Sequence, residues 1–332
     1  MLFLWIIIFI ASLAVLVKGA DWLLQSAEKI GLALGISPFI VGVTIVGLGT
    51  SCPELISSIM ATMKGVTEIV TAGAIGSNIA NILLVVGVAA IIGKRLIISK
   101  SLIDLDLPLL AISTVLFLGI VWDKQVTFVE AIILLIAYVI YLLYTFLHKE
   151  EETDEIYEVL PGRPNRRKLR TANINKKPAI KRPKIITKDI IMLIIGIIAL
   201  FIGAKYLIDS VIKLSEILNI GAGVISLAAV ALGTSLPELL VSAKAAFQGK
   251  SEVALGNIFG SNVFNLLVVV GIPGLIRNLQ VDETTFTLGL PVLLVATFLF
   301  IISGISRRIH IWEGAMYLLV YIFFIGKLFN IF

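Results

Sequence analysis

Two segments of the chain carry a threonine, a glutamate and a serine at intervals of four residues, which puts the three side chains on one face of a helix. They are Thr50, Glu54 and Ser58 in the first segment and Thr234, Glu238 and Ser242 in the second. Each segment is followed by a serine and an asparagine four residues apart, namely Ser77 with Asn81 and Ser261 with Asn265. Hard cations prefer oxygen ligands, and calcium takes about six to eight of them. The pattern therefore predicts a cation site in which two carboxylates either neutralise one divalent ion or bind several sodium ions.

Each glutamate of these segments directly follows a proline, Pro53 or Pro237. Proline lacks the N–H that a helix needs, and its ring clashes with the carbonyl four residues earlier, which belongs to Gly49 or Gly233. We therefore expect both helices to break at the proline. The freed backbone oxygens beside the carboxylates are expected to serve as ion ligands, as they do in the broken helices of transporters.

The two segments belong to a longer internal repeat, in which each residue has a counterpart 184 positions later, as Glu238 is to Glu54. Between residues 47–87 and 231–271, 19 of 41 positions are identical. The identities include Thr, Ser, Pro, Glu, Asn and Gly, so a shared leucine- and isoleucine-rich composition does not explain them. The sequence therefore predicts two structurally similar halves.

Apolar helices must position these residues. Of the 332 residues, 58% are hydrophobic and 15% are charged, whereas soluble domains average about 45–50% and about 25%. The apolar runs are long enough for membrane helices and too uniform for the alternating strands of a membrane barrel. The ten predicted spans cover approximately residues 2–24, 38–64, 72–92, 105–121, 128–147, 190–214, 223–247, 254–276, 286–302 and 311–328.

Each half contains five of these spans, an odd number, so the second half must enter the membrane from the opposite side to the first. We therefore predict an all-α integral membrane protein of ten helices, built from two inverted-topology five-helix repeats. Residues 1–147 form the first repeat, 148–188 a charged linker and 189–332 the second repeat. Inverted repeats give two near-equivalent packings that open to opposite sides, which is typical of transporters.

The linker between the halves contains twelve lysine and arginine residues, and loops rich in these residues stay in the cytoplasm. The linker is therefore predicted to be cytoplasmic, with both termini extracellular, in a multi-pass protein of the cell membrane. Its basic part is either simply solvated or binds anionic lipid. Because the net charge of +5 comes from this one loop, it does not indicate nucleic-acid binding. The single cysteine, Cys52, excludes an intrachain disulfide.

The motifs GTSCPELISS with GSNIAN, and GTSLPELLVS with GSNVFN, resemble the two alpha repeats of the sodium/calcium exchanger family, within the wider cation/calcium antiporters. The resemblance covers nearly the whole chain. It implies that Glu54 and Glu238 are the central ligands and that Thr50 and Thr234 join them on calcium. It further implies flanking sodium sites and two asparagines lining the middle. The residues at these further positions are Ser77 and Ser261, the backbone carbonyls of Gly47 and Ala231, the hydroxyls of Ser51 and Ser235, and the side chains of Asn81 and Asn265.

The chain departs from the family pattern in two places, and its two repeats differ from each other in a third. Some relatives, including those that co-transport potassium, carry an aspartate where this chain has Asn265, which argues for potassium independence. The linker of about forty residues is too short for the calcium-sensing domains of animal exchangers. Ala72 and Gly73 stand where the second half has Gly256 and Asn257, so the two flanking sites need not have equal affinity.

The sequence thus predicts secondary antiport of calcium against sodium by alternating access, in a single chain in the lipid bilayer and without a cofactor. The first helix of each half is expected to slide across a core that carries the site. A calcium/proton antiporter that uses the same glutamates remains open, because the oxygens of Ser77 and Ser261 favour sodium only mildly. A calcium-permeable channel has no use for inverted repeats. Nothing in the sequence resembles a nucleophile–base pair or a cofactor motif, so an enzyme is not expected.

Overall fold

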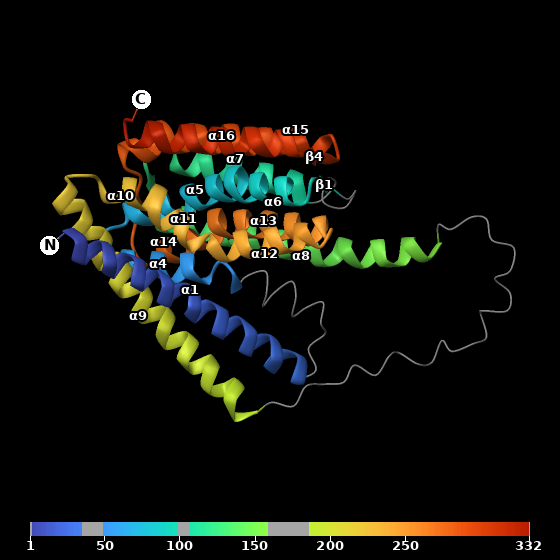
Figure 1. Cartoon of the computed structure of the whole chain (residues 1–332), viewed down its shortest axis with the longest axis horizontal. Coiled ribbons are helices and arrows are strands. Elements are labelled where there is room, and N and C mark those ends of the chain that lie inside the picture. Colours follow the sequence, from blue (N-terminus) through green and yellow to red (C-terminus); the bar gives the residue numbers. More distant parts are fainter. Residues whose placement is uncertain (1, 35–48, 99–105, 159–185, 332) are drawn as a thin grey trace, which may run out of the picture.

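The computed structural model describes residues 2–34, 49–98, 106–158 and 186–331. This part of the chain is nearly all helical, with four short strands between helices (Figure 1). A helix satisfies its backbone N–H and C=O groups within one segment, which a bilayer requires. The long apolar runs of the sequence therefore fold as helices rather than strands.

The elements of the two halves follow one another in the same order. In the first half they are α1 (Leu2–Ala33), α4 (Cys52–Met63), α5 (Glu68–Ile79), η2 (Ala80–Val85), α6 (Val86–Ile92), β1 (Arg95–Ile97), α7 (Leu107–Ile120), η4 (Val121–Asp123), β2 (Gln125–Val126) and α8 (Phe128–Glu158). In the second half they are α9 (Thr187–Leu218), α10 (Ala222–Ile225), η6 (Ser226–Val230), α11 (Ala231–Thr234), α12 (Leu236–Phe247), α13 (Ser251–Phe264), η7 (Asn265–Val269), α14 (Gly271–Ile276), β3 (Leu279–Gln280), η8 (Thr285–Gly289), α15 (Leu290–Ile305), β4 (Arg308–His310) and α16 (Ile311–Leu328).

Within the described residues, seven helical stretches are long and apolar enough to cross a membrane, and a bent pair of helices makes an eighth. The seven are Leu2–Ala27, Glu68–Ile92, Phe128–Thr145, Thr187–Leu218, Val253–Ile276, Thr285–Ile305 and Ile311–Leu328. Helix α7 is apolar but shorter. The first part of the predicted second span, residues 38–48, lies outside the described residues, and α4 lies in the remaining part. Helix α8 extends beyond residue 147 to Glu158, into the predicted linker.

The bent pair comprises Ala222–Thr234 and α12, and it turns by 43°. The break lies at Ser235, two residues earlier than predicted, because Pro237 occupies the first turn of α12. In a first turn the missing N–H of a proline would have had no partner in any case. Pro53 holds the same position in α4. The break places Thr234 at the end of one helix and Glu238 in the first turn of the next.

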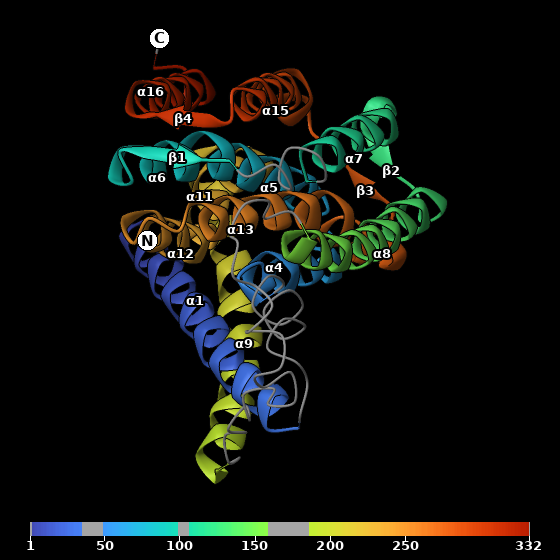
Figure 2. The same ribbon diagram turned by 90° about the vertical axis from the view of Figure 1, so that its right-hand side faces the viewer.

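Helices α1 and α9 lie side by side and lean away from the bundle formed by the other helices (Figures 1 and 2). Glycines allow the two backbones to approach closely. A Cβ atom on Gly196 would lie 2.7 Å from the backbone nitrogen of Leu23, and one on Gly203 would lie 2.7 Å from that of Leu16. Small residues commonly permit such contacts between helices in membranes.

Among the described residues, an ion pair connects this outer helix pair to the bundle. Lys64, which follows the last residue of α4, binds the carboxylate of Asp209 on α9. Its ammonium group also donates to the backbone carbonyl of Lys205 at 3.1 Å. A second ion pair, between Lys29 and Asp189 at 3.3 Å, joins α1 to the first turn of α9.

Two short antiparallel strand pairs join the halves of the chain. Strand β1 pairs with β4, with Leu96 opposite Ile309, and β2 pairs with β3, with Val126 opposite Leu279. Because β3 precedes α15 and β4 follows it, the two pairs lie at opposite ends of that helix. Each strand of one half therefore pairs with a strand of the other half.

The centre of the bundle is formed by the two spans that carry the GSN motifs. In Glu68–Ile92 and in Val253–Ile276, 78% of the most apolar stretch is buried, against 17–44% in the other single spans. Polar side chains on these two spans are therefore shielded from lipid and available to a site inside the protein.

Candidate cation-binding site

The two glutamates lie in the first turns of α4 and α12, immediately after the interruptions described above. Both side chains are buried, with Glu54 5% and Glu238 0% exposed. The start of α4 lies at the Glu238 carboxylate, because Ser51, three residues before Glu54, donates a hydrogen bond to Glu238. A helix N-terminus favours negative charge through its unpaired N–H groups, so each carboxylate is partly compensated by its own helix. The predicted meeting of Glu54 and Glu238 inside the protein is therefore present in the structure.

The Glu238 carboxylate has hydrogen-bond donors from both halves of the chain. Ser51 Oγ donates to Glu238 Oε1 at 3.1 Å, and Ser261 Oγ donates to the same oxygen at 3.3 Å. Among the described residues, the other oxygen, Oε2, has no hydrogen-bond partner. Glu238 thus has one oxygen held by hydroxyl groups and one buried oxygen that is available to a ligand.

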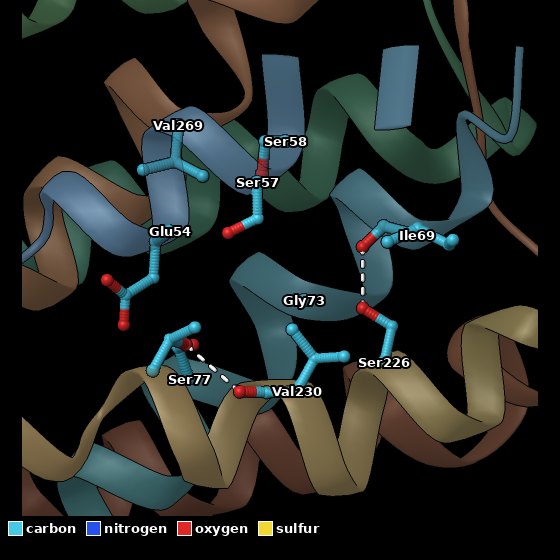
Figure 3. A pocket seen from close by; sticks show the side chains of 10 residues that line it. Glu54, Ser57, Ser58, Ile69, Gly73, Ser77, Ser226, Val230 and Val269 are labelled. Atoms are coloured by element: carbon cyan, nitrogen blue, oxygen red, sulfur yellow. Dashed lines mark hydrogen bonds between the residues drawn. The ribbon is translucent and has the colours of Figure 1, made fainter. Parts of the chain in front are cut away.

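The Glu54 carboxylate accepts no hydrogen bond on either oxygen from the described residues. It borders a narrow pocket whose wall contains both polar and apolar residues (Figure 3). The polar residues that line this pocket with Glu54 are Ser57, Ser58, Ser77, Ser226 and Thr234. Of these, Ser77 is 1% exposed and its hydroxyl has no partner in the described chain. The pocket therefore offers carboxylate and hydroxyl oxygens with free lone pairs.

The two asparagines of the motifs lie in π-helical turns inside the most buried spans. Asn81 belongs to η2 and Asn265 begins η7. Both are completely buried, and neither side-chain amide has a hydrogen-bond partner in the described part of the protein. π-Helical turns often mark functional sites. A buried polar group without a partner costs about 1–3 kcal/mol, so these amides indicate a polar ligand between the two spans.

The other predicted ligands are placed as follows. Thr234 lies beside Glu54, and its hydroxyl donates to the carbonyl of Val230 at 3.1 Å. The hydroxyl of Ser235 is buried and has no partner among the described residues. The carbonyl of Ala231 accepts the N–H of Ser235 at 3.1 Å, and the Thr234 hydroxyl lies 3.5 Å from it as a second donor. Gly47, the counterpart of Ala231, lies outside the described residues.

Thr50 is the last of the predicted ligands, and its surroundings differ from those of Thr234. Its hydroxyl lies beside the carboxylate of Glu238. It also donates to the side-chain oxygen of Asn257 at 3.5 Å. The structure thus places Thr50 at the Glu238 carboxylate and Thr234 at the Glu54 carboxylate.

Four polar residues near the site were not among the predicted ligands. Asn78 and Asn262 are counterparts in the repeat, and the amide of Asn78 donates to the backbone carbonyl of Asn262 at 3.0 Å. Their presence in both GSN motifs is a signal that sequence analysis could have used. Asn257 and Ser226 have no polar counterpart in the other half, where Gly73 and Gly42 stand. Comparison of the halves therefore did not select them as ligands.

The donors at the site are oxygen atoms and neutral amides. Among the described residues there is no group of three His, Cys, Asp or Glu side chains that could hold a metal ion. Transition metals favour nitrogen and sulfur ligands, whereas calcium and sodium suit carboxylate, hydroxyl and carbonyl oxygens. The donor set with its unpaired buried oxygens therefore fits a hard cation.

Comparison with known proteins supports this chemistry. A family model described as sodium/calcium exchanger protein matches residues 4–147 and 188–329. The chain belongs to the sodium/calcium exchanger family. It is therefore a multi-pass membrane protein of a family of transporters rather than of enzymes, and the resemblance noted in the motifs is confirmed.

Individual known proteins match over nearly the whole chain. The sodium/calcium exchanger MaX1 of Methanosarcina acetivorans is 34% identical over 98% of both chains. An uncharacterised membrane protein of Methanocaldococcus jannaschii is 30% identical over 96% of both chains. Among solved structures, the sodium-calcium exchanger NCX_Mj has 30% identity and a TM-score of 0.63, covering 98% of this chain and 99% of its own.

Proposed function

We propose that the chain exchanges calcium for sodium across the cell membrane by alternating access, through a midplane site built on Glu54 and Glu238. The observation that carries this proposal is the pair of buried carboxylates with three oxygens that accept no hydrogen bond among the described residues. Two carboxylates balance one calcium ion, and a carboxylate without a cation is costly inside a membrane. The family membership supports the same ions.

The carboxylate oxygens of Glu54 and Glu238 also explain why calcium is exchanged for sodium. Calcium needs both carboxylates at once, with Thr50 and Thr234 adding hydroxyl oxygens. Sodium ions bind next to the carboxylates, at flanking sites formed by Ser77 and Ser261 to which the backbone carbonyls of Gly47 and Ala231 contribute. The side chains of Ser51, Ser235, Asn81 and Asn265 complete the oxygen set. Calcium and sodium therefore compete for Glu54 and Glu238, and this competition couples their movement in opposite directions.

We further propose ten spans in two inverted repeats, residues 1–147 and 189–332, connected by a cytoplasmic linker at 148–188, with both termini extracellular. Three observations support the repeats. In the repeat, β3 is the counterpart of β1 and β4 is the counterpart of β2, so the β1–β4 pair of strands corresponds to the β3–β2 pair. The π-helical turns η2 and η7 occupy counterpart positions. The family model matches the two halves separately and leaves the linker unmatched. Because the site draws on both halves of one chain, a single copy is sufficient for transport.

The decisive experiment is radioactive calcium uptake into proteoliposomes that contain the purified protein. Vesicles loaded with sodium and diluted into sodium-free buffer are expected to accumulate calcium, whereas vesicles loaded with potassium or choline are not. A further set carries an imposed pH gradient without sodium. Uptake driven by that gradient alone would replace sodium by protons as the coupling ion. Calcium flux that needs no counter-ion would instead indicate a channel.

Replacement of Ser51 by alanine tests the hydroxyl that positions Glu238. A hydrogen bond to a charged group contributes about 1.5–3 kcal/mol, so we expect the calcium concentration for half-maximal uptake to rise roughly ten-fold or more. The repeat counterpart Ser235 provides a matched control, because its hydroxyl contacts neither glutamate within hydrogen-bond distance. Ser235→Ala is expected to change calcium dependence less and sodium dependence more. Equal calcium curves for the two variants would contradict the role given to Ser51.

A further inference from the structure

The side chain of Asn257 connects the cation site to the body of α13. It lies one helical turn before Ser261, which itself donates to Glu238. The amide oxygen of Asn257 accepts the hydroxyl proton of Thr50 at 3.5 Å, and its NH₂ group donates to Ser242 Oγ at 3.3 Å. Ser242 in turn donates to the carbonyl of Ala254 at 3.2 Å. The hydrogen bonds therefore run in one direction, away from the site.

The other half of the chain lacks this connection. The counterpart of Asn257 is Gly73, which has no side chain and borders the pocket at Glu54. A Cβ atom on Gly73 would lie 3.1 Å from Ser226 Oγ, so even a small side chain would crowd that pocket. Thr234 instead donates its proton to the main-chain carbonyl of Val230. The hydroxyl groups of the two threonines thus donate to different kinds of acceptor, a side-chain amide for Thr50 and a backbone carbonyl for Thr234.

The direction of the Thr50 hydroxyl group matters for cation binding, because the group has one proton and two lone pairs. A hydroxyl binds a cation through its lone pairs and must direct its proton elsewhere. Glu238 lies beside Thr50 as well, but a calcium ion on Glu238 would oppose a proton pointing toward that carboxylate. The amide oxygen of Asn257 is the second acceptor within reach of the Thr50 hydroxyl, and the bond to Ser242 holds this amide in place.

We propose that Asn257 is a positioning residue for calcium binding. Its amide oxygen accepts the hydrogen bond of the Thr50 hydroxyl, so that the lone pairs of the Thr50 oxygen face the ion. The inference rests on the proposed function, since it assumes that calcium binds between Glu54 and Glu238. It adds a residue that acts through Thr50 and not on the ion itself. It also makes the two threonine ligands unequal, because only Thr50 depends on a side chain from another helix.

The test is equilibrium binding of radioactive calcium to the purified protein in detergent without sodium, together with calcium uptake in proteoliposomes. One hydrogen bond contributes about 1 kcal/mol. Removing the bond to Thr50 by Asn257→Ala is therefore expected to weaken calcium binding roughly five-fold. The maximal uptake rate and the sodium concentration for half-maximal exchange are expected to stay unchanged. Thr114→Val is the control, since Thr114 is buried and its hydroxyl donates to the carbonyl of Leu110 within α7 and not to a residue of the site.

A double-mutant cycle separates positioning from a general structural effect. In a Thr50→Val background no hydroxyl is left to orient, so Asn257→Ala is expected to cause no further loss of calcium binding. Additive losses would overturn the proposal, and so would an Asn257→Ala protein whose calcium binding equals that of the unmodified protein. If the unmodified protein binds no calcium and shows no sodium-driven uptake, the proposed function itself fails. The two failures are therefore distinguishable.

Discussion

Replacement of Glu238 by glutamine is expected to abolish sodium-driven calcium uptake while the protein remains folded. The substitution keeps the shape of the side chain and removes its charge, so calcium would be held by Glu54 alone. Removing one partner of a buried charge pair costs about 3–5 kcal/mol, which corresponds to a loss of roughly 100-fold or more in calcium binding. Radioactive calcium uptake and equilibrium binding on the same preparation measure this loss. Glu54→Gln is expected to have the same effect.

The control for these variants is Glu216→Gln. Glu216 is exposed on α9 and pairs with Lys213 at 2.7 Å, one turn away on the same helix. Exposed pairs contribute little, so uptake by this variant should equal that of the unmodified protein. The melting temperatures of all three variants in detergent should show whether any loss of uptake comes from unfolding. Calcium uptake by a folded Glu238→Gln protein would contradict the assignment of the site.

Replacement of Gly76 by alanine is expected to destabilise the protein strongly and to eliminate transport. An added Cβ would lie 2.2 Å from the carbonyl oxygen of Leu227 and 2.8 Å from the Cβ of Ala231. Neither contact can be relieved by rotating a side chain, so α5 must move away from η6 and α11. Overpacking of this kind costs about 1–3 kcal/mol or more. The displaced segment leads directly to Thr234, so the ligands at Glu54 would be displaced with it.

Thermal unfolding followed by the amount of monodisperse protein on size exclusion measures this effect. Gly119→Ala provides the comparison, because Gly119 is an exposed helical glycine with open space around its Cβ position among the described residues. That substitution should leave stability unchanged or raise it slightly, since alanine favours helix. A Gly76→Ala protein as stable as the Gly119→Ala protein would contradict the close contact between α5 and η6.

Much of the site was predictable because the chain contains the pattern twice. The repeated spacing of Thr50 and Glu54, and of Ser77 and Asn81, identifies helix faces without any structure. The burial of a carboxylate in an apolar run then requires a partner or a cation. The meeting of Glu54 with Glu238 follows from the repeat, and the structure shows it.

The features that escaped prediction are those in which one half differs from the other. Asn257 was noted only as a departure from Gly73, because its partners Thr50 and Ser242 lie on other elements and only tertiary structure brings them together. The position of the helix break was predicted at the proline, yet a proline in a first turn is compatible with a helix. The bend at Ser235 depends on how α11 and α12 pack, which local sequence does not determine.

The ion pair between Lys64 and Asp209 has a consequence for the energy of the two end states of transport. Its repeat counterparts are Gln248 and Gln25, which carry no charge. In an inverted repeat, the packing that opens to the opposite side would bring the glutamines together in place of Lys64 and Asp209. Under the proposed alternating access, the two end states would then differ in energy, and the protein without bound ions would favour the state that opens to one particular side of the membrane. Such a carrier has a built-in polarity that comes from its outer helices and not from its ion ligands.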